Sequence, residues 1–128
     1  MKRTIKRMLA MLLATLTLIS ALTLTASAET YSGRYNNLYY TTRLTIASDK
    51  YSANAKITYE GSAQIHAIGT AYYRPVGGTY TYTMPLITPK TTTLSEKTVY
   101  VSSSYNIYHV SEDYYIGTTN IETMNVNA

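Results

Sequence analysis

Tyrosine is the residue type in this chain whose number and spacing most suggest a chemical role. The 128 residues contain 15 tyrosines but no phenylalanine, tryptophan or cysteine. Neighbouring residues of a strand point to opposite faces, so an adjacent tyrosine pair in a strand places one ring outward. The chain has three such pairs: Tyr39–Tyr40, Tyr72–Tyr73 and Tyr114–Tyr115. The alternation around the first two pairs assigns the outward positions to Tyr39 and Tyr72, and it leaves the third pair open.

An exposed tyrosine offers a rigid ring with a polar tip and loses little conformational entropy on binding. Such rings stack on sugars or pack against partner proteins, so we predict Tyr39 and Tyr72 as ligand-binding residues. The competing interpretation is that tyrosine replaces phenylalanine in the core, as the apolar parity of Tyr51, Tyr59 and Tyr73 indicates. The outward rings would then have no role, because scattered exposed apolar groups are normal.

The two histidines lack the neighbours that a metal site or a catalytic base requires. His66 lies on the polar side of an alternating run, and His109 is distant from it in the sequence. A zinc site needs further ligands at characteristic spacing, and a general base needs a nucleophile to act on. We therefore expect surface histidines, no metal site and no cofactor.

No catalytic residue is predicted from the acids or the serines. Glu112 and Asp113 are adjacent, which is typical of a turn, whereas a glycosidase needs two carboxyl groups across a cleft. The chain contains no G-x-S-x-G motif, glycine-rich phosphate loop or calcium-binding loop. The leading hypothesis is a secreted non-catalytic binding module that uses surface tyrosines to engage a glycan or protein. The alternatives are a secreted structural or self-assembling surface protein, and a small secreted enzyme or antibacterial factor.

Residues 1–28 have the three parts of a cleavable signal peptide. Four basic residues (Lys2, Arg3, Lys6 and Arg7) precede an apolar run over 8–24, and Ala26-Ser27-Ala28 forms an A-x-A cleavage site. The alternative is an uncleaved membrane anchor, for which the apolar run is short. The expected mature chain, from Glu29, carries seven basic and seven acidic residues. We therefore expect an extracellular protein whose partner is a glycan or a protein, rather than a nucleic acid or, after cleavage, a membrane.

The strongest structural pattern is the alternation of apolar and polar residues over 51–74. Its two halves are separated by Glu60-Gly61-Ser62, which predicts an antiparallel hairpin with Ile57 and Ile65 on its core face. Turn residues also occur over 48–50, as Ser-Asp-Lys, and over 75–78, as Pro-Val-Gly-Gly.

Alternating runs divide residues 39–128 into about seven short strands without a helical period, and 29–38 is expected to be a loose leader. This pattern predicts a single all-β domain: an antiparallel two-sheet sandwich, immunoglobulin-like in architecture, with a small β-barrel as the alternative. Without cysteine, the domain must be held together by packing alone.

A signal peptide followed by a Thr-, Ser- and Tyr-rich β domain resembles small uncharacterised secreted proteins of Gram-positive bacteria. The resemblance covers most of the expected mature chain. It is carried by Arg34-Tyr35, by the strand Leu44-Thr45-Ile46-Ala47-Ser48 and by the turn Tyr59-Glu60-Gly61. It implies export and a bacterial source, and it brings no activity or site residue to this chain.

Overall fold

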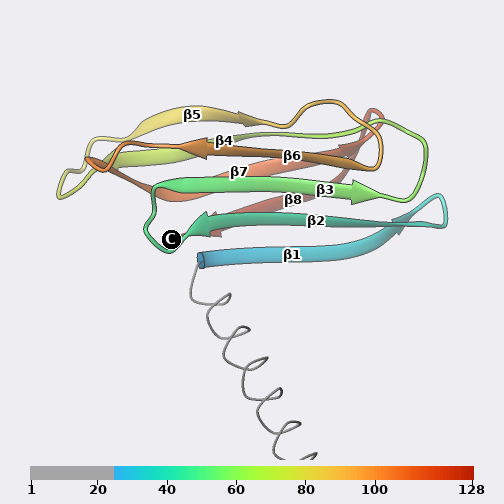
Figure 1. Ribbon diagram of the computed structural model, residues 1–128, viewed down its shortest axis with the longest axis horizontal. Helices are drawn as coiled ribbons and strands as arrows, with labels where there is room; N and C mark the ends of the chain where they lie inside the picture. Colours follow the sequence, from blue (N-terminus) through green and yellow to red (C-terminus); the bar gives the residue numbers. More distant parts are fainter. Residues whose placement is uncertain (1–24) are drawn as a thin grey trace, which may run out of the picture.

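The computed structural model describes residues 25–128, which form eight β-strands in two antiparallel sheets of four strands (Figure 1). Sheet A has the order β1-β2-β3-β6, with β1 (Thr25–Tyr35), β2 (Leu38–Ala47), β3 (Ser52–Tyr59) and β6 (Leu94–Tyr100). Sheet B has the order β5-β4-β7-β8, with β5 (Tyr82–Ile87), β4 (Ile65–Pro75), β7 (Tyr105–Ile116) and β8 (Thr119–Asn127). The predicted all-β two-sheet sandwich is confirmed, and the two sheets do not close into the alternative barrel.

Across residues 25–128, no helix is long and apolar enough to span a membrane. Most of the predicted signal peptide lies outside the described residues, so its cleavage after Ala28 stays a prediction.

The segment expected to be a loose leader forms the edge strand β1 instead. It pairs with β2 from Thr25, opposite Ala47, to Tyr35, opposite Leu38. The connecting turn has positive φ at Asn36 (50°) and Asn37 (63°), which is the two-residue hairpin geometry that matches strand twist. Asparagine tolerates this left-handed conformation, so the Asn36-Asn37 pair is the sequence signal for the additional strand.

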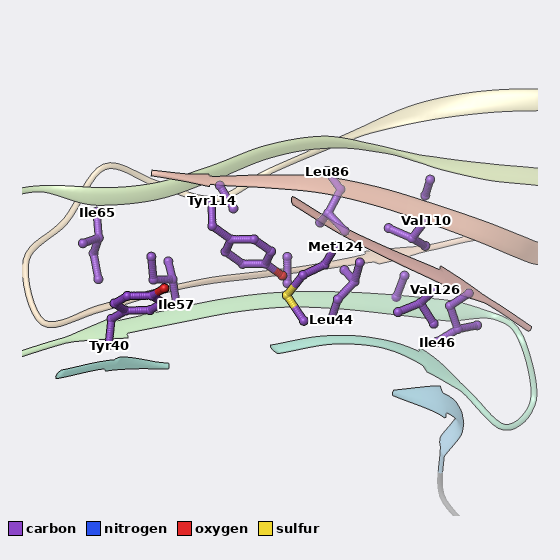
Figure 2. Packing of buried hydrophobic residues seen from close by; sticks show 14 of the residues in the cluster. Tyr40, Leu44, Ile46, Ile57, Ile65, Leu86, Val110, Tyr114, Met124 and Val126 are labelled. Carbon is purple, nitrogen blue, oxygen red and sulfur yellow. The ribbon is translucent and has the colours of Figure 1, made fainter. Parts of the chain in front are cut away.

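The core lies between the two sheets and is built mainly from alternate residues of β2, β3, β4, β7 and β8 (Figure 2). Sheet A contributes mainly Tyr40, Leu44, Ile46, Ala53, Ala55 and Ile57, and sheet B contributes mainly Ile65, Leu86, Ile107, Val110, Tyr114, Met124 and Val126. Each fully buried leucine or isoleucine stabilises the fold by roughly 1.5–3 kcal/mol. The Tyr114 hydroxyl crosses the core and donates a hydrogen bond of 2.8 Å to the Arg43 carbonyl of the opposite sheet. At Tyr40 and Tyr114, therefore, tyrosine does replace phenylalanine as the core aromatic.

The hairpin predicted over 51–74 is wrong, although the core faces of its two strands are right. β3 pairs with β2 and β6 in sheet A, whereas β4 pairs with β5 and β7 in sheet B. Ile57 and Ile65 are both fully buried because they face the same core from opposite sheets. Alternation predicts which face of a strand is buried, but it is the same for a hairpin and for a crossover between sheets. Gly61 is not in the left-handed region, and a side chain there would meet the Tyr59 ring.

Glu112 and Asp113 do not form the predicted turn, because both lie within β7. The β7–β8 turn is located at Gly117 instead, where a φ of 60° favours glycine. The other two turns lie where the sequence predicts them. The Lys50 amide donates to the Ala47 carbonyl at 2.9 Å, and the turn after β4 closes with a similar bond from Gly78 to Pro75.

Candidate functional site

The three tyrosine pairs divide between core and surface as the alternation predicts. The inward rings are Tyr40, Tyr73 and Tyr114, and the outward rings are Tyr39, Tyr72 and Tyr115. The structure also shows which ring of the third pair points outward. Tyr114 is fully buried, whereas Tyr115 stacks against His66 on the outer face of sheet B.

Tyr39 and Tyr72 do not share a site, because they lie on the outer faces of different sheets. Tyr39 is in β2 of sheet A, where the guanidinium carbon of Arg34 lies 4.3 Å from its ring centre. Tyr72 is in β4 of sheet B, and its ring centre lies 6.4 Å from that of Tyr108 and 5.2 Å from that of His109. A ligand that contacts one of these rings therefore does not contact the other.

Tyrosine rings gather at one end of the sandwich, where β4 and β6 end and β5 and β7 begin, on the left in Figure 1. A hollow of about 240 Å³ at this end is lined by Tyr73, Met84, Tyr100, Val101, Ser102 and Tyr105. Tyr80 and Tyr82 extend the ring cluster outward from it. We call the hollow together with Tyr80 and Tyr82 the tyrosine notch.

Four rings of the tyrosine notch, those of Tyr73, Tyr80, Tyr82 and Tyr105, hold one another in place through a chain of contacts. Tyr73 stacks on Tyr82, its register partner in β5, with ring centres 5.6 Å apart. Tyr105 meets both rings edge-on at 5.5 and 5.9 Å, and Tyr80 continues the chain at 5.0 Å from Tyr82. Stacked and edge-to-face pairs of this kind each add roughly 0.5–1.5 kcal/mol beyond the burial of their area.

The loops that carry the tyrosine notch are tied together through their backbones. The Val76 amide donates to the Ser104 carbonyl at 2.9 Å, which joins the turn after β4 to the β6–β7 connection. The Tyr105 amide donates to the Ser102 carbonyl at 3.0 Å. A ligand entering a site that is already ordered pays less conformational entropy, so these bonds favour binding.

Two rings of the tyrosine notch are not explained by packing. Tyr73 and Tyr105 are partly buried and close the end of the core, whereas Tyr80 is 70% and Tyr100 72% exposed. The side chains that line the hollow present ring faces, hydroxyl groups and apolar carbons, but no acid, histidine, lysine or arginine. This arrangement offers stacking and hydrogen bonding rather than general acid–base chemistry.

The sequence alone did not indicate this site. Alternation gives the face of each strand, but it does not tell which loops meet at the end of a sandwich. The available signal is that Tyr73 and Tyr80 flank the Pro75–Gly78 turn, which brings them to the same end of the domain.

The expected surface position of His66 is wrong. Its side chain is only 8% exposed and stacks on Tyr115 with ring centres 4.9 Å apart. Burial lowers the pKa of His66, and the positive charge of Lys90 lowers it further. His109 is partly exposed, and its Nδ1 lies 2.7 Å from Oδ1 of Asn127. In the part of the chain that the structure describes, no three histidine or acidic side chains are grouped to hold a metal ion.

The most unusual ionisable group is Glu112, which faces the core rather than a turn. The residue is 1% exposed, and neither of its carboxyl oxygens has a hydrogen-bond partner within residues 25–128. Gly69 is its register partner on β4, and a side chain there would meet this carboxyl group, so the absent side chain makes room for it. Burial raises the pKa of Glu112 to about 9, and the neighbouring charge of Asp113 acts in the same direction. The carboxyl group is therefore neutral at pH 7.

The residues thus bring ring faces and hydroxyl groups together at one end of the sandwich, and they place the two tyrosines predicted from the sequence on separate faces. Comparison with models of protein families, with curated proteins and with solved structures finds no match to this chain.

Proposed function

We propose that the protein is a secreted, non-catalytic binding module that holds a neutral glycan in the tyrosine notch. The observation that carries this proposal is the exposure of Tyr80 and Tyr100 beside a hollow walled by other tyrosine rings. The C–H face of a sugar ring fits a flat aromatic surface, and sugar hydroxyls exchange hydrogen bonds with tyrosine and serine hydroxyls. A neutral ligand is favoured because no charged side chain lines the hollow to pair with an ionised group.

The shape of the tyrosine notch favours a glycan over a protein partner. Small-ligand sites are concave pockets of roughly 300 Å³ and more, and the hollow of about 240 Å³ is close to that lower limit. A protein partner would need a contiguous surface of roughly 800 Å² on each side. One end of a sugar chain therefore matches the hollow, with the next sugar against the exposed rings.

The test compares three tyrosine variants with the wild type by affinity electrophoresis in gels that contain xylan, mannan, hydroxyethylcellulose or soluble, fully N-acetylated chitin oligomers. Stacked rings contribute on the order of 1 kcal/mol each, so the change of Tyr80 and Tyr100 together to Ala should weaken binding at least tenfold. The matched controls Tyr39→Ala and Tyr72→Ala remove rings from the two sheet faces and should leave retardation unchanged.

All four substituted side chains lie at or near the surface, so the variants should stay folded, which circular dichroism checks. Loss of binding in either sheet-face variant, with binding retained in the double variant, would place the ligand elsewhere and contradict the proposal. The absence of retardation by every glycan in the panel would contradict it as well.

A further inference from the structure

The outer face of sheet A holds two positive charges side by side. Arg43 on β2 is in register with Lys56 on β3, and both point away from the core because their chain neighbours Thr42, Leu44, Ala55 and Ile57 are buried. Directly opposed residues of an antiparallel pair have Cβ atoms roughly 5 Å apart, and like charges in such pairs destabilise a sheet. Folding therefore does not favour Arg43 beside Lys56, and the favourable register partner of Lys56 is Glu96 on its other side.

These two cations line a hollow with three hydroxyl groups. The hollow has a volume of about 340 Å³ and is lined by Thr30, Thr41, Arg43, Lys56 and Thr58. Thr30 on β1 is in register with Arg43, and Thr41 is in register with Thr58. Guanidinium and ammonium groups donate strong hydrogen bonds to anionic oxygens, and threonine hydroxyls add neutral donors. The set suits a phosphate or sulfate group, which presents several acceptor oxygens in one place.

The hollow continues into a second one that is less polar. Thr41 and Thr58 line both hollows, and the second, of about 300 Å³, extends to Tyr39, Leu94 and Thr93. Tyr39 and Leu94 are half-exposed there. Thr93 has a φ of 73°, a conformation that is costly for a β-branched residue and that occurs in turns and at functional sites.

We propose that this face is a second binding site, which takes a glycan bearing a phosphate or sulfate ester. The ester lies between Arg43 and Lys56, and the sugar that carries it extends along Thr41 and Thr58 toward Tyr39. This site is separate from the tyrosine notch, and its ligand differs in charge. The expected mature chain carries as many acids as bases, so its net charge gives it no general attraction to polyanions. Selective binding of an ester would therefore have to come from this site.

Two acids border the site, and their negative charge affects the expected affinity for an anionic ester. Glu96 on β6 is in register with Lys56 on the side away from Arg43, and Glu60 lines the second hollow. Glu96 reduces the positive potential at the ester position. Neutralising Glu96 should therefore raise the affinity for the ester, whereas neutralising Arg43 or Lys56 should lower it.

The test measures binding of the protein to dextran sulfate, dextran phosphate and unmodified dextran of one chain length by isothermal titration calorimetry. We expect at least one ester to bind tenfold or more tightly than unmodified dextran, and the ester that binds identifies the ligand group. Arg43→Gln and Lys56→Gln should each weaken that binding about tenfold, whereas Glu96→Gln should tighten it severalfold. The matched control Lys90→Gln makes the same charge change in the β5–β6 connection, beside His66 of sheet B, and it should alter the affinity less than twofold.

Equal weakening by Lys90→Gln and Lys56→Gln would mean that only net charge matters, and it would overturn the proposal. Failure of both esters to bind more tightly than unmodified dextran would overturn it too. Tyr39→Ala should weaken ester binding while the Tyr80 and Tyr100 variants leave it unchanged, which distinguishes this site from the tyrosine notch. The reverse result would assign the ester to the notch and contradict the second site.

Discussion

At the scale of single residues, Glu112 is the position where sequence and fold conflict most. A carboxyl group in an apolar core without hydrogen-bond partners is costly to ionise, and it responds by remaining protonated. The buried, inward-facing residues of β2 and β3 carry no charge. Asp113 adds a negative charge next in the chain, which disfavours ionisation further. The glutamate is therefore a source of pH-dependent stability.

Replacing Glu112 with Gln should make the protein more stable at neutral and alkaline pH. Between the ordinary pKa of 4.5 and the raised value of about 9, the folded chain holds a proton that the unfolded chain has lost. Raising the pH through this range therefore favours unfolding, and each pH unit costs about 1.4 kcal/mol. We expect Glu112→Gln to be about 3 kcal/mol more stable than the wild type at pH 7, and similar to it at pH 4.

Urea denaturation of both proteins at pH 4, 5, 7 and 9 measures this difference directly, because the other titrating groups are common to both. The gap between the two free energies of unfolding should widen from pH 5 to pH 9. Parallel curves across that range would mean that the Glu112 carboxyl is solvated or paired in the folded protein, contrary to the structure.

At the scale of strands, the contribution of a side chain to stability depends on whether it lies on the core face or the outer face of its sheet. Ile65 and Ile68 lie on the same strand, β4, but Ile65 is fully buried and Ile68 is 44% exposed on the outer face of sheet B. Ile57 is fully buried on β3 in the opposite sheet. The same isoleucine-to-alanine change therefore tests the faces of both sheets against an internal control.

Ile57→Ala and Ile65→Ala should each lower the free energy of unfolding by about 2–5 kcal/mol, because each leaves a cavity between the sheets. Ile68→Ala should cost less than about 1 kcal/mol, since much of its side chain is already in water. Guanidinium denaturation of the three variants checks the order. A cost for Ile68→Ala as large as that for Ile65→Ala would mean that the outer face of sheet B is covered.

The same strands show how far the sequence could predict the fold. Period-two alternation correctly predicted the buried faces of β2, β3 and β4, because a strand with one face on the core has no other way to hide its apolar residues. It could not predict that β3 and β4 belong to different sheets, since that depends on how the chain crosses the core after Tyr59. The turn predicted at Glu112-Asp113 is wrong because it also rested on local sequence alone. Adjacent acids favour a turn locally, whereas the space left by Gly69 on the neighbouring strand allows Glu112 to face the core.

At the scale of the whole molecule, the sandwich keeps its candidate sites apart. The tyrosine notch lies at one end, and the pair Arg43 and Lys56 lies on the outer face of sheet A. Alternation correctly predicted Tyr39 and Tyr72 as outward, but their separation on two sheets and the gathering of other rings at the end follow from topology. The tertiary arrangement, rather than any local motif, therefore selects which tyrosines can act together.

The most direct test of the tyrosine notch is to observe the tyrosine rings themselves during a titration. With ring-¹³C tyrosine in the protein, nuclear magnetic resonance resolves the rings while a soluble neutral hexasaccharide, prepared from each glycan of the panel in turn, is added. The structure predicts that the shifted signals belong to the rings of the notch: Tyr73, Tyr80, Tyr82, Tyr100 and Tyr105. Tyr31 and Tyr39, which are exposed elsewhere, should not move. Shifts confined to Tyr39 or Tyr72, or no ring shift with any of the hexasaccharides, would contradict the proposed function.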